Sequence, residues 1–85
     1  MFTEEEKKIL IFGLRWQINS NNSGIDTIKR GITDCTHSKD VWEKRGDQEK
    51  VKYYHELIEK GKYNIFESIK ENQLLEELII KIKLA

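Results

Sequence analysis

The chain has 85 residues, of which 38% are hydrophobic and 35% charged, with no proline and one cysteine. Its 15 basic and 15 acidic side chains cancel, and both signs are spread evenly along the chain, unlike the basic stripe of a nucleic-acid binder or the acidic face of a DNA mimic. The size fits one domain, residues 1–85, with a modest core. A single cysteine forms no disulfide within the chain, and no apolar run approaches the roughly 20 residues of a membrane span. The acidic start of the chain is unlike a secretory signal. We therefore expect a cytoplasmic protein.

The N-terminal segment, residues 3–18, is predicted to form a helix. Thr3 and Glu6 have the spacing of a capping box, and the polar run 19–24 is expected to end the helix. Apolar residues also alternate with others over 10–18, which is a strand pattern, but the cap and the acidic opening favour a helix. One apolar face carries Ile9, Phe12 and Trp16, and another carries Leu10, Ile11, Leu14 and Ile18. Because both faces are apolar, we expect neighbours to enclose this helix at the centre of the fold.

The middle, residues 25–45, is expected to form two short helices around Cys35. Isoleucines at i, i+3 and i+7 define the first helix, and the second covers Lys39–Arg45 and is closed by Gly46. Asp47 is then a suitable N-cap for an amphipathic helix that ends near residue 61.

The last segment opens at Asn64, another residue suited to capping a helix. Its apolar residues lie on two nearly opposite faces, so either the helix breaks near Asn72 or it stays continuous and two surfaces bury it. No heptad repeat is evident, and a long coiled coil is not expected. The predicted fold is therefore all-α, a small compact bundle of four or five helices around a central N-terminal helix.

The C-terminal stretch carries more apolar side chains than a core of this size can bury. Seven of the eleven residues from 74 to 84 are Leu or Ile. Because large exposed apolar patches usually mark interfaces, we expect a homodimer or a contact with a protein partner, mainly through the C-terminal helix. The residues expected in this protein interface are Leu74, Leu75, Leu78, Ile79, Ile82, Trp42 and Tyr63.

An alternative interpretation is a small nucleic-acid-binding regulator. Basic side chains interleaved with an aromatic ring suit phosphate contact and base stacking, and the two short helices of 29–45 would resemble a helix–turn–helix. The residues that would bind nucleic acid are Lys29, Arg30, Lys39, Trp42, Lys44 and Arg45.

Residues that could carry chemistry are few. Cys35, His37 and His55 do not have the paired spacing of a zinc site, and a cysteine nucleophile would lack a recognisable orienting group. Nucleotide-binding glycine motifs are absent, so we expect no metal, no cofactor and no enzymatic activity. The overall composition resembles that of short helical proteins of bacteria and their phages, and this resemblance implies a regulator or inhibitor that acts by binding a protein.

Overall fold

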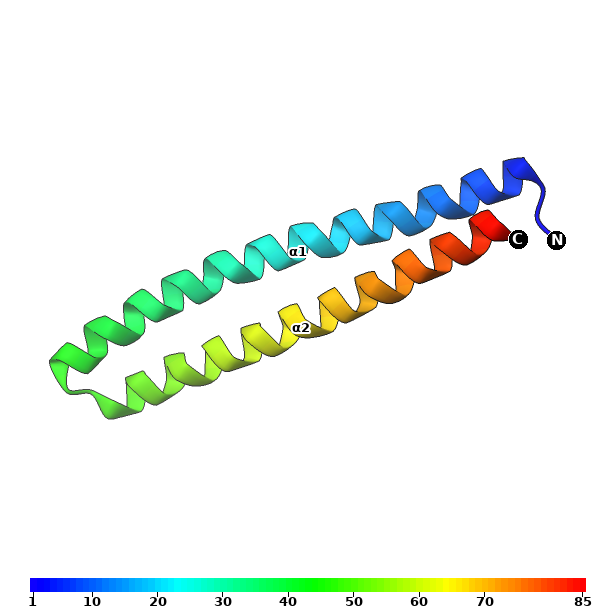
Figure 1. The fold of residues 1–85 in the computed structure, drawn as a ribbon. Helices are drawn as coiled ribbons and strands as arrows, with labels where there is room; N and C mark the ends of the chain where they lie inside the picture. Colours follow the sequence, from blue (N-terminus) through cyan, green and yellow to red (C-terminus); the bar gives the residue numbers. More distant parts are fainter.

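The computed structural model describes all 85 residues as two long helices, α1 (Glu4–Arg45) and α2 (Gln48–Leu84). The helices run antiparallel and are joined by a two-residue turn, so α1 begins and α2 ends at the same end of the hairpin, which we call the open end (Figure 1). The hairpin measures 63 × 14 × 11 Å, and its radius of gyration is 19.1 Å, against about 12 Å for a compact domain of this length. The chain is all-α, as predicted, but the compact bundle of four or five helices is wrong.

The start of α1 is the capping box that the sequence predicts. The Glu6 amide donates to Thr3 Oγ1 over 3.1 Å, and the Glu6 carboxylate accepts from the Thr3 amide over 2.8 Å. The helix does not end in the polar run 19–24, and 25–45 is not divided into two short helices, because α1 continues without interruption to Arg45. Asn, Ser and Gly lower helix propensity by less than about 1 kcal/mol each, and packing against α2 outweighs that cost.

The turn follows the two signals that the sequence contains. Gly46 has a left-handed backbone (φ 77°), which ends α1, and its amide donates to the Glu43 carbonyl over 3.1 Å. Asp47 caps α2 by accepting from the Lys50 amide over 3.2 Å. The boundaries predicted at residues 61 and 64 are absent, because α2 is continuous to Leu84. Of the two alternatives left open for the last segment, the helix stays continuous and does not break near Asn72.

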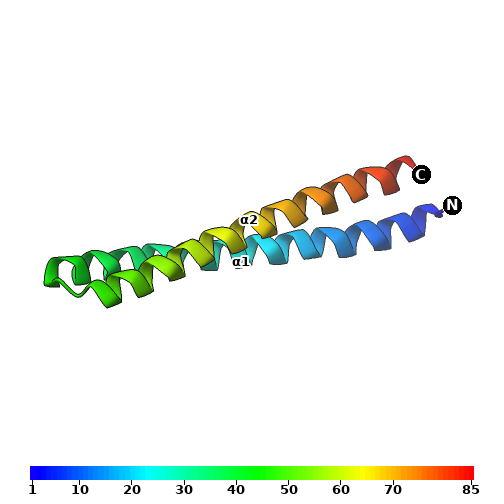
Figure 2. The ribbon, with the colours of Figure 1, turned by 90° about the horizontal axis from the view of Figure 1, so that it is seen from below.

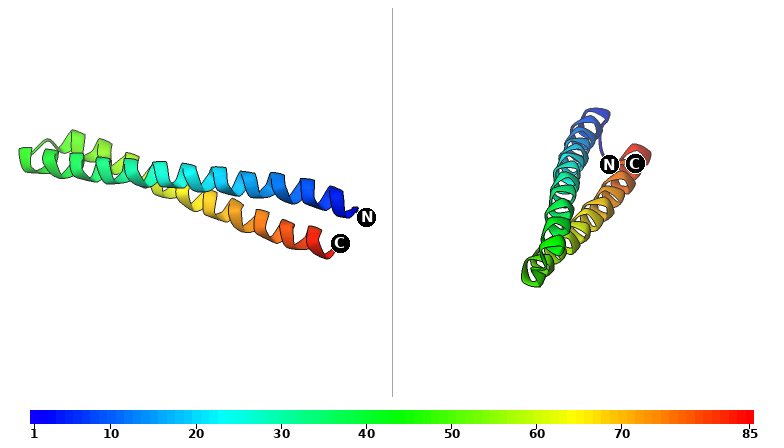
Figure 3. Two further views of the ribbon diagram at one scale, coloured as in Figure 1. Left: turned by 90° about the horizontal axis from the view of Figure 1, so that it is seen from above. Right: turned by 90° about the vertical axis from the view of Figure 1, so that its left-hand side faces the viewer.

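A heptad repeat runs along both helices and forms the seam between them, contrary to the expectation from the sequence. The residues of this seam advance in alternating steps of three and four, and all of them are buried or half-buried. In α2, every residue that is not exposed belongs to the repeat. A strict seven-residue repeat makes helices coil around each other, and the two helices cross at a shallow angle (Figures 2 and 3). The seam consists of Lys7, Ile11, Leu14, Ile18, Asn21, Ile25, Ile28, Ile32, Cys35, Lys39 and Trp42 in α1, and Val51, Tyr54, Ile58, Gly61, Ile65, Ser68, Asn72, Leu75, Ile79 and Ile82 in α2.

The buried core is limited to five isoleucines of the seam, namely Ile18, Ile25, Ile58, Ile79 and Ile82. The predicted enclosure of α1 on two faces does not occur, because α2 covers only one of them. The three ion pairs each join residues three apart on one helix or at its cap, and none links α1 to α2. Apolar packing along one narrow seam therefore holds the hairpin together.

Candidate protein interface

Large apolar side chains cover the side of α1 that faces away from α2. Phe2 is 45% exposed, Ile9 70%, Phe12 73% and Trp16 64%. We call these four residues the outer stripe. Phe2 precedes α1 and lines a shallow hollow with Glu6, Ile9 and Leu10. At 100° per residue Ile9, Phe12 and Trp16 fall within one arc nearly opposite the seam, and with Glu5 they repeat the same steps of three and four. The first turns of α1 therefore present a second surface with the spacing that packs against a helix.

Exposed apolar residues of α2 also lie at the open end, on other sides of the hairpin than the outer stripe. Leu74 and Leu78 lie on one flank of the seam, and Ile69, Ile80 and Leu84 lie on the other or on the outer side. Eleven of the fifteen large exposed hydrophobic residues precede Gly24 or follow from Ile69 onward. The open half of the hairpin is thus much more apolar than the half that carries the turn.

The residues predicted to form an interface do not lie together. Ile79 and Ile82 are 2% and 7% exposed and Leu75 is half-buried, because these three pack in the seam against α1. Leu74 and Leu78 remain exposed. The C-terminal segment therefore uses one face for the hairpin itself, and only its other faces are free for a partner.

Trp42 and Tyr63 lie away from the open end. Trp42 sits beside the turn, where Lys50 Nζ lies 3.5 Å from the centre of its ring. Tyr63 is exposed midway along α2. The exposed aromatic side chains of the open end are instead those of Phe2, Phe12 and Trp16, and the four-residue spacing of Phe12 and Trp16 is visible in the sequence.

A polar layer interrupts the apolar seam in the open half. Asn21 Nδ2 donates to Asn72 Oδ1 over 2.8 Å, and Asn72 Nδ2 donates to Asn22 Oδ1 over 3.0 Å. Gln17 Nε2 completes the chain of amides by donating to Asn21 Oδ1 over 2.9 Å. The two bonds to Asn72 join the helices, whereas the Gln17–Asn21 bond lies within α1. A paired asparagine at such a position fixes how helices align.

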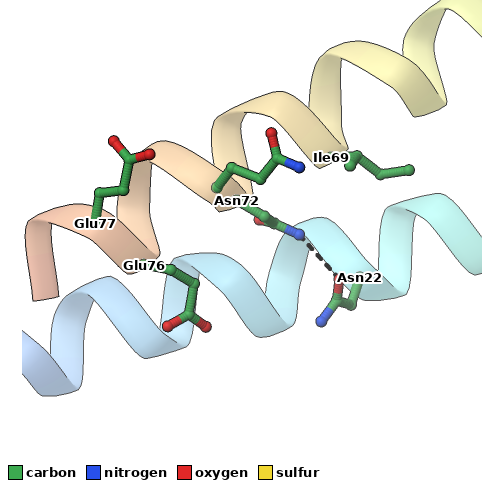
Figure 4. Close-up of a pocket in the computed structure, with 6 residues that line it drawn as sticks. Asn22, Ile69, Asn72, Glu76 and Glu77 are labelled. Atoms are coloured by element: carbon green, nitrogen blue, oxygen red, sulfur yellow. Dashed lines mark hydrogen bonds between the residues drawn. The ribbon is translucent and has the colours of Figure 1, made fainter. Parts of the chain in front are cut away.

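An open groove runs beside this layer between the two helices (Figure 4). It is lined by Asn22, Ile69, Asn72, Gln73, Glu76 and Glu77. Five of these six residues are polar or acidic, and Glu77 points away from α1 in Figure 4. The groove has no enclosed, mostly apolar wall of the kind that binds a small molecule.

The residues proposed for nucleic-acid binding are placed on one uninterrupted helix, so the predicted helix–turn–helix is not formed. They point in several directions, since Lys39 belongs to the seam while Arg30 and Lys44 face outward. The Trp42 ring already has Lys50 and Arg45 over it, with the Arg45 guanidinium carbon 4.9 Å from the ring centre. These contacts occupy the face that would stack on a base. The full set, Lys29, Arg30, Lys39, Trp42, Lys44 and Arg45, is therefore not gathered into a groove-binding element.

Titratable and metal-ligating groups are dispersed. Cys35 lies half-buried in the seam, whereas His37 and His55 are exposed. Nowhere do three His, Cys, Asp or Glu side chains come together as a metal ion would require. The hydrogen bond from the Thr3 backbone, and to a smaller extent one from its side chain, lower the pKa of the Glu6 carboxyl below its ordinary value of 4.5. The capping box therefore stabilises the ionised form of Glu6.

Neither helix combines the length and the apolar character that crossing a membrane demands. Comparisons with known protein families, with curated proteins and with solved structures give no match. The exposed apolar residues of the open end are the feature of the molecule that packing within the chain does not explain.

Proposed function

We propose that this hairpin is a non-enzymatic protein-interaction module that binds a helical protein surface through its open end. The observation that supports the proposal is the outer stripe, whose four large side chains are each between 45% and 73% exposed. Burying a side chain of this size yields about 1.5–3 kcal/mol. Single exposed hydrophobic residues are ordinary on soluble proteins, whereas a periodic apolar stripe indicates a docking surface.

The hairpin geometry suits a docking role. Both helices are long and their seam is continuous, so the open end is held on a straight support 63 Å long. A regulator or inhibitor in the cytoplasm, of the kind that short bacterial or phage proteins provide, would act by covering a helix-binding surface of its target. The alternative role in nucleic-acid binding has no specific observation in its favour, since its residues do not share one face.

Site-specific photo-crosslinking in the producing cell tests this function. A photoreactive phenylalanine analogue at Phe12 is compared with the same analogue at Thr33, which is exposed on the turn half of α1. We expect protein adducts at Phe12 and far fewer at Thr33. Equal adduct formation at the two positions, or none at Phe12, would contradict a docking surface at the open end.

A further inference from the structure

The hairpin exposes more surface than a folded chain of its mass should. Its accessible surface is 6617 Å², whereas a compact monomer of 10.1 kDa exposes about 5,300 Å². The excess of roughly 1,300 Å² exceeds the approximately 800 Å² that each partner buries in a standard interface. The excess surface is thus more than enough to supply one partner's share of a standard protein–protein interface.

The small core indicates that this burial belongs to the folded state itself. Only five side chains are buried in 85 residues, and isolated helices depend on packing for most of their stability. A partner that stabilises the hairpin must be present whenever the chain folds. Another copy of the same chain meets this requirement at any concentration at which the protein accumulates, and a net charge of zero does not oppose its approach.

From these observations we infer that the occupant of the open end is a second copy of this chain. Two hairpins pack their outer stripes against each other about a twofold axis, which makes a four-helix homodimer over the open halves. This inference rests on the proposed function, because it identifies the partner of the same surface. In such an isologous contact each residue of the stripe enters the interface twice.

The charges favour an antiparallel pairing of the two copies of α1. A parallel pairing would place the acidic first turns, Glu4–Glu6, of both copies side by side, where like charges repel. An antiparallel pairing centred near Ile9 places the acidic turn of one copy beside Arg15 of the other, since the outer stripe ends at Trp16.

Sedimentation equilibrium of the full chain tests the inference. We expect a dimer at about 10 µM, and we expect Phe12→Glu with Trp16→Glu to weaken dimerisation at least 100-fold, because two charges per copy replace buried aromatic anchors. The matched control is Tyr53→Glu with Tyr63→Glu, which alters two exposed aromatic residues of α2 outside the open end and should leave the dimer intact. Circular dichroism identifies any variant that loses helix. If the stripe variant is unfolded at 10 µM but regains helix as its concentration rises, its folding is coupled to self-association, and the inference is supported.

Other outcomes separate the inference from the proposed function. A wild-type chain that is helical and monomeric at 100 µM overturns the homodimer, and if Phe12 then still crosslinks to a different protein, the docking function stands. A dimer that the stripe and control variants weaken equally places the contact elsewhere and overturns the inference. A monomer that binds anionic lipid vesicles through Phe12 and Trp16 assigns the stripe to a membrane surface and overturns both proposals.

Discussion

Gly61 provides the sharpest test of the packing between the two helices. A Cβ atom at this position would lie 3.0 Å from Ile32 Cγ1 and 3.3 Å from Ile28 Cγ2, closer than the 3.5–4.0 Å or so at which carbon atoms pack best. Gly61→Ala gains about 0.5–1 kcal/mol of helix stability, but crowding a packed seam typically costs about 1–3 kcal/mol. We therefore expect the stability of the variant to range from that of wild type to about 2.5 kcal/mol below it.

The control is Gly31→Ala, where nothing lies within 4 Å of the new Cβ. This variant keeps the gain in helix propensity and should be about 0.5–1 kcal/mol more stable than wild type. Urea unfolding followed by circular dichroism measures both at one protein concentration, because self-association would make the midpoint depend on concentration. The reasoning fails if Gly61→Ala stabilises the chain as much as Gly31→Ala does.

Three further predictions follow from local contacts. Gly46→Ala should lower the free energy of unfolding by about 1–2 kcal/mol in urea titrations, because φ is 77° there and alanine resists that conformation; an unchanged midpoint would contradict the assigned turn. Asn21→Ala and Asn72→Ala should show a coupling energy of about 0.5–1.5 kcal/mol in a double-mutant cycle, owing to their 2.8 Å hydrogen bond, and strictly additive effects would refute that bond. The pKa of Glu6 is lower in the folded chain, so its capping contribution is complete above pH 4.5 and is lost as pH falls through the folded value. The protection of the first-turn amides of α1, measured relative to the intrinsic exchange rate at each pH, should fall there, and Glu6→Gln should abolish this fall in protection.

Boundaries set by local chemistry were predictable from the sequence. The capping box at Thr3, the left-handed Gly46 and the capping Asp47 each depend on residues within one turn of the helix end, so their spacing is sufficient. Gly61 is different. Glycine often ends a helix, but this glycine lies within α2, at a seam position where a small residue packs against Ile32. Only the position of the other helix distinguishes these two roles.

The sequence does not predict the hairpin, because the repeat that forms it is not purely apolar. Polar or small residues such as Lys7, Asn21, Gly61 and Ser68 occupy seam positions, so a search for apolar residues alone does not find the repeat. At the same time, the exposed aromatic residues of the open end give α1 a second apolar face, and this pattern predicts a helix that several neighbours enclose. The two faces of the first helix were therefore recognised, but the sequence could not show that one of them lacks a partner within the chain.

The two-residue turn also constrains how the length of this molecule can change. Asn21 and Asn72 lie equally far along the chain from the Gly46–Asp47 turn, and so do Ile32 and Gly61, which are in contact. Inserting one residue in either helix would rotate everything beyond it by about 100° and break every such match. Insertions or deletions preserve the pairing only when seven residues are added to, or removed from, both helices at positions equally far from the turn. The hairpin can therefore lengthen or shorten only by two helical turns in both helices at once.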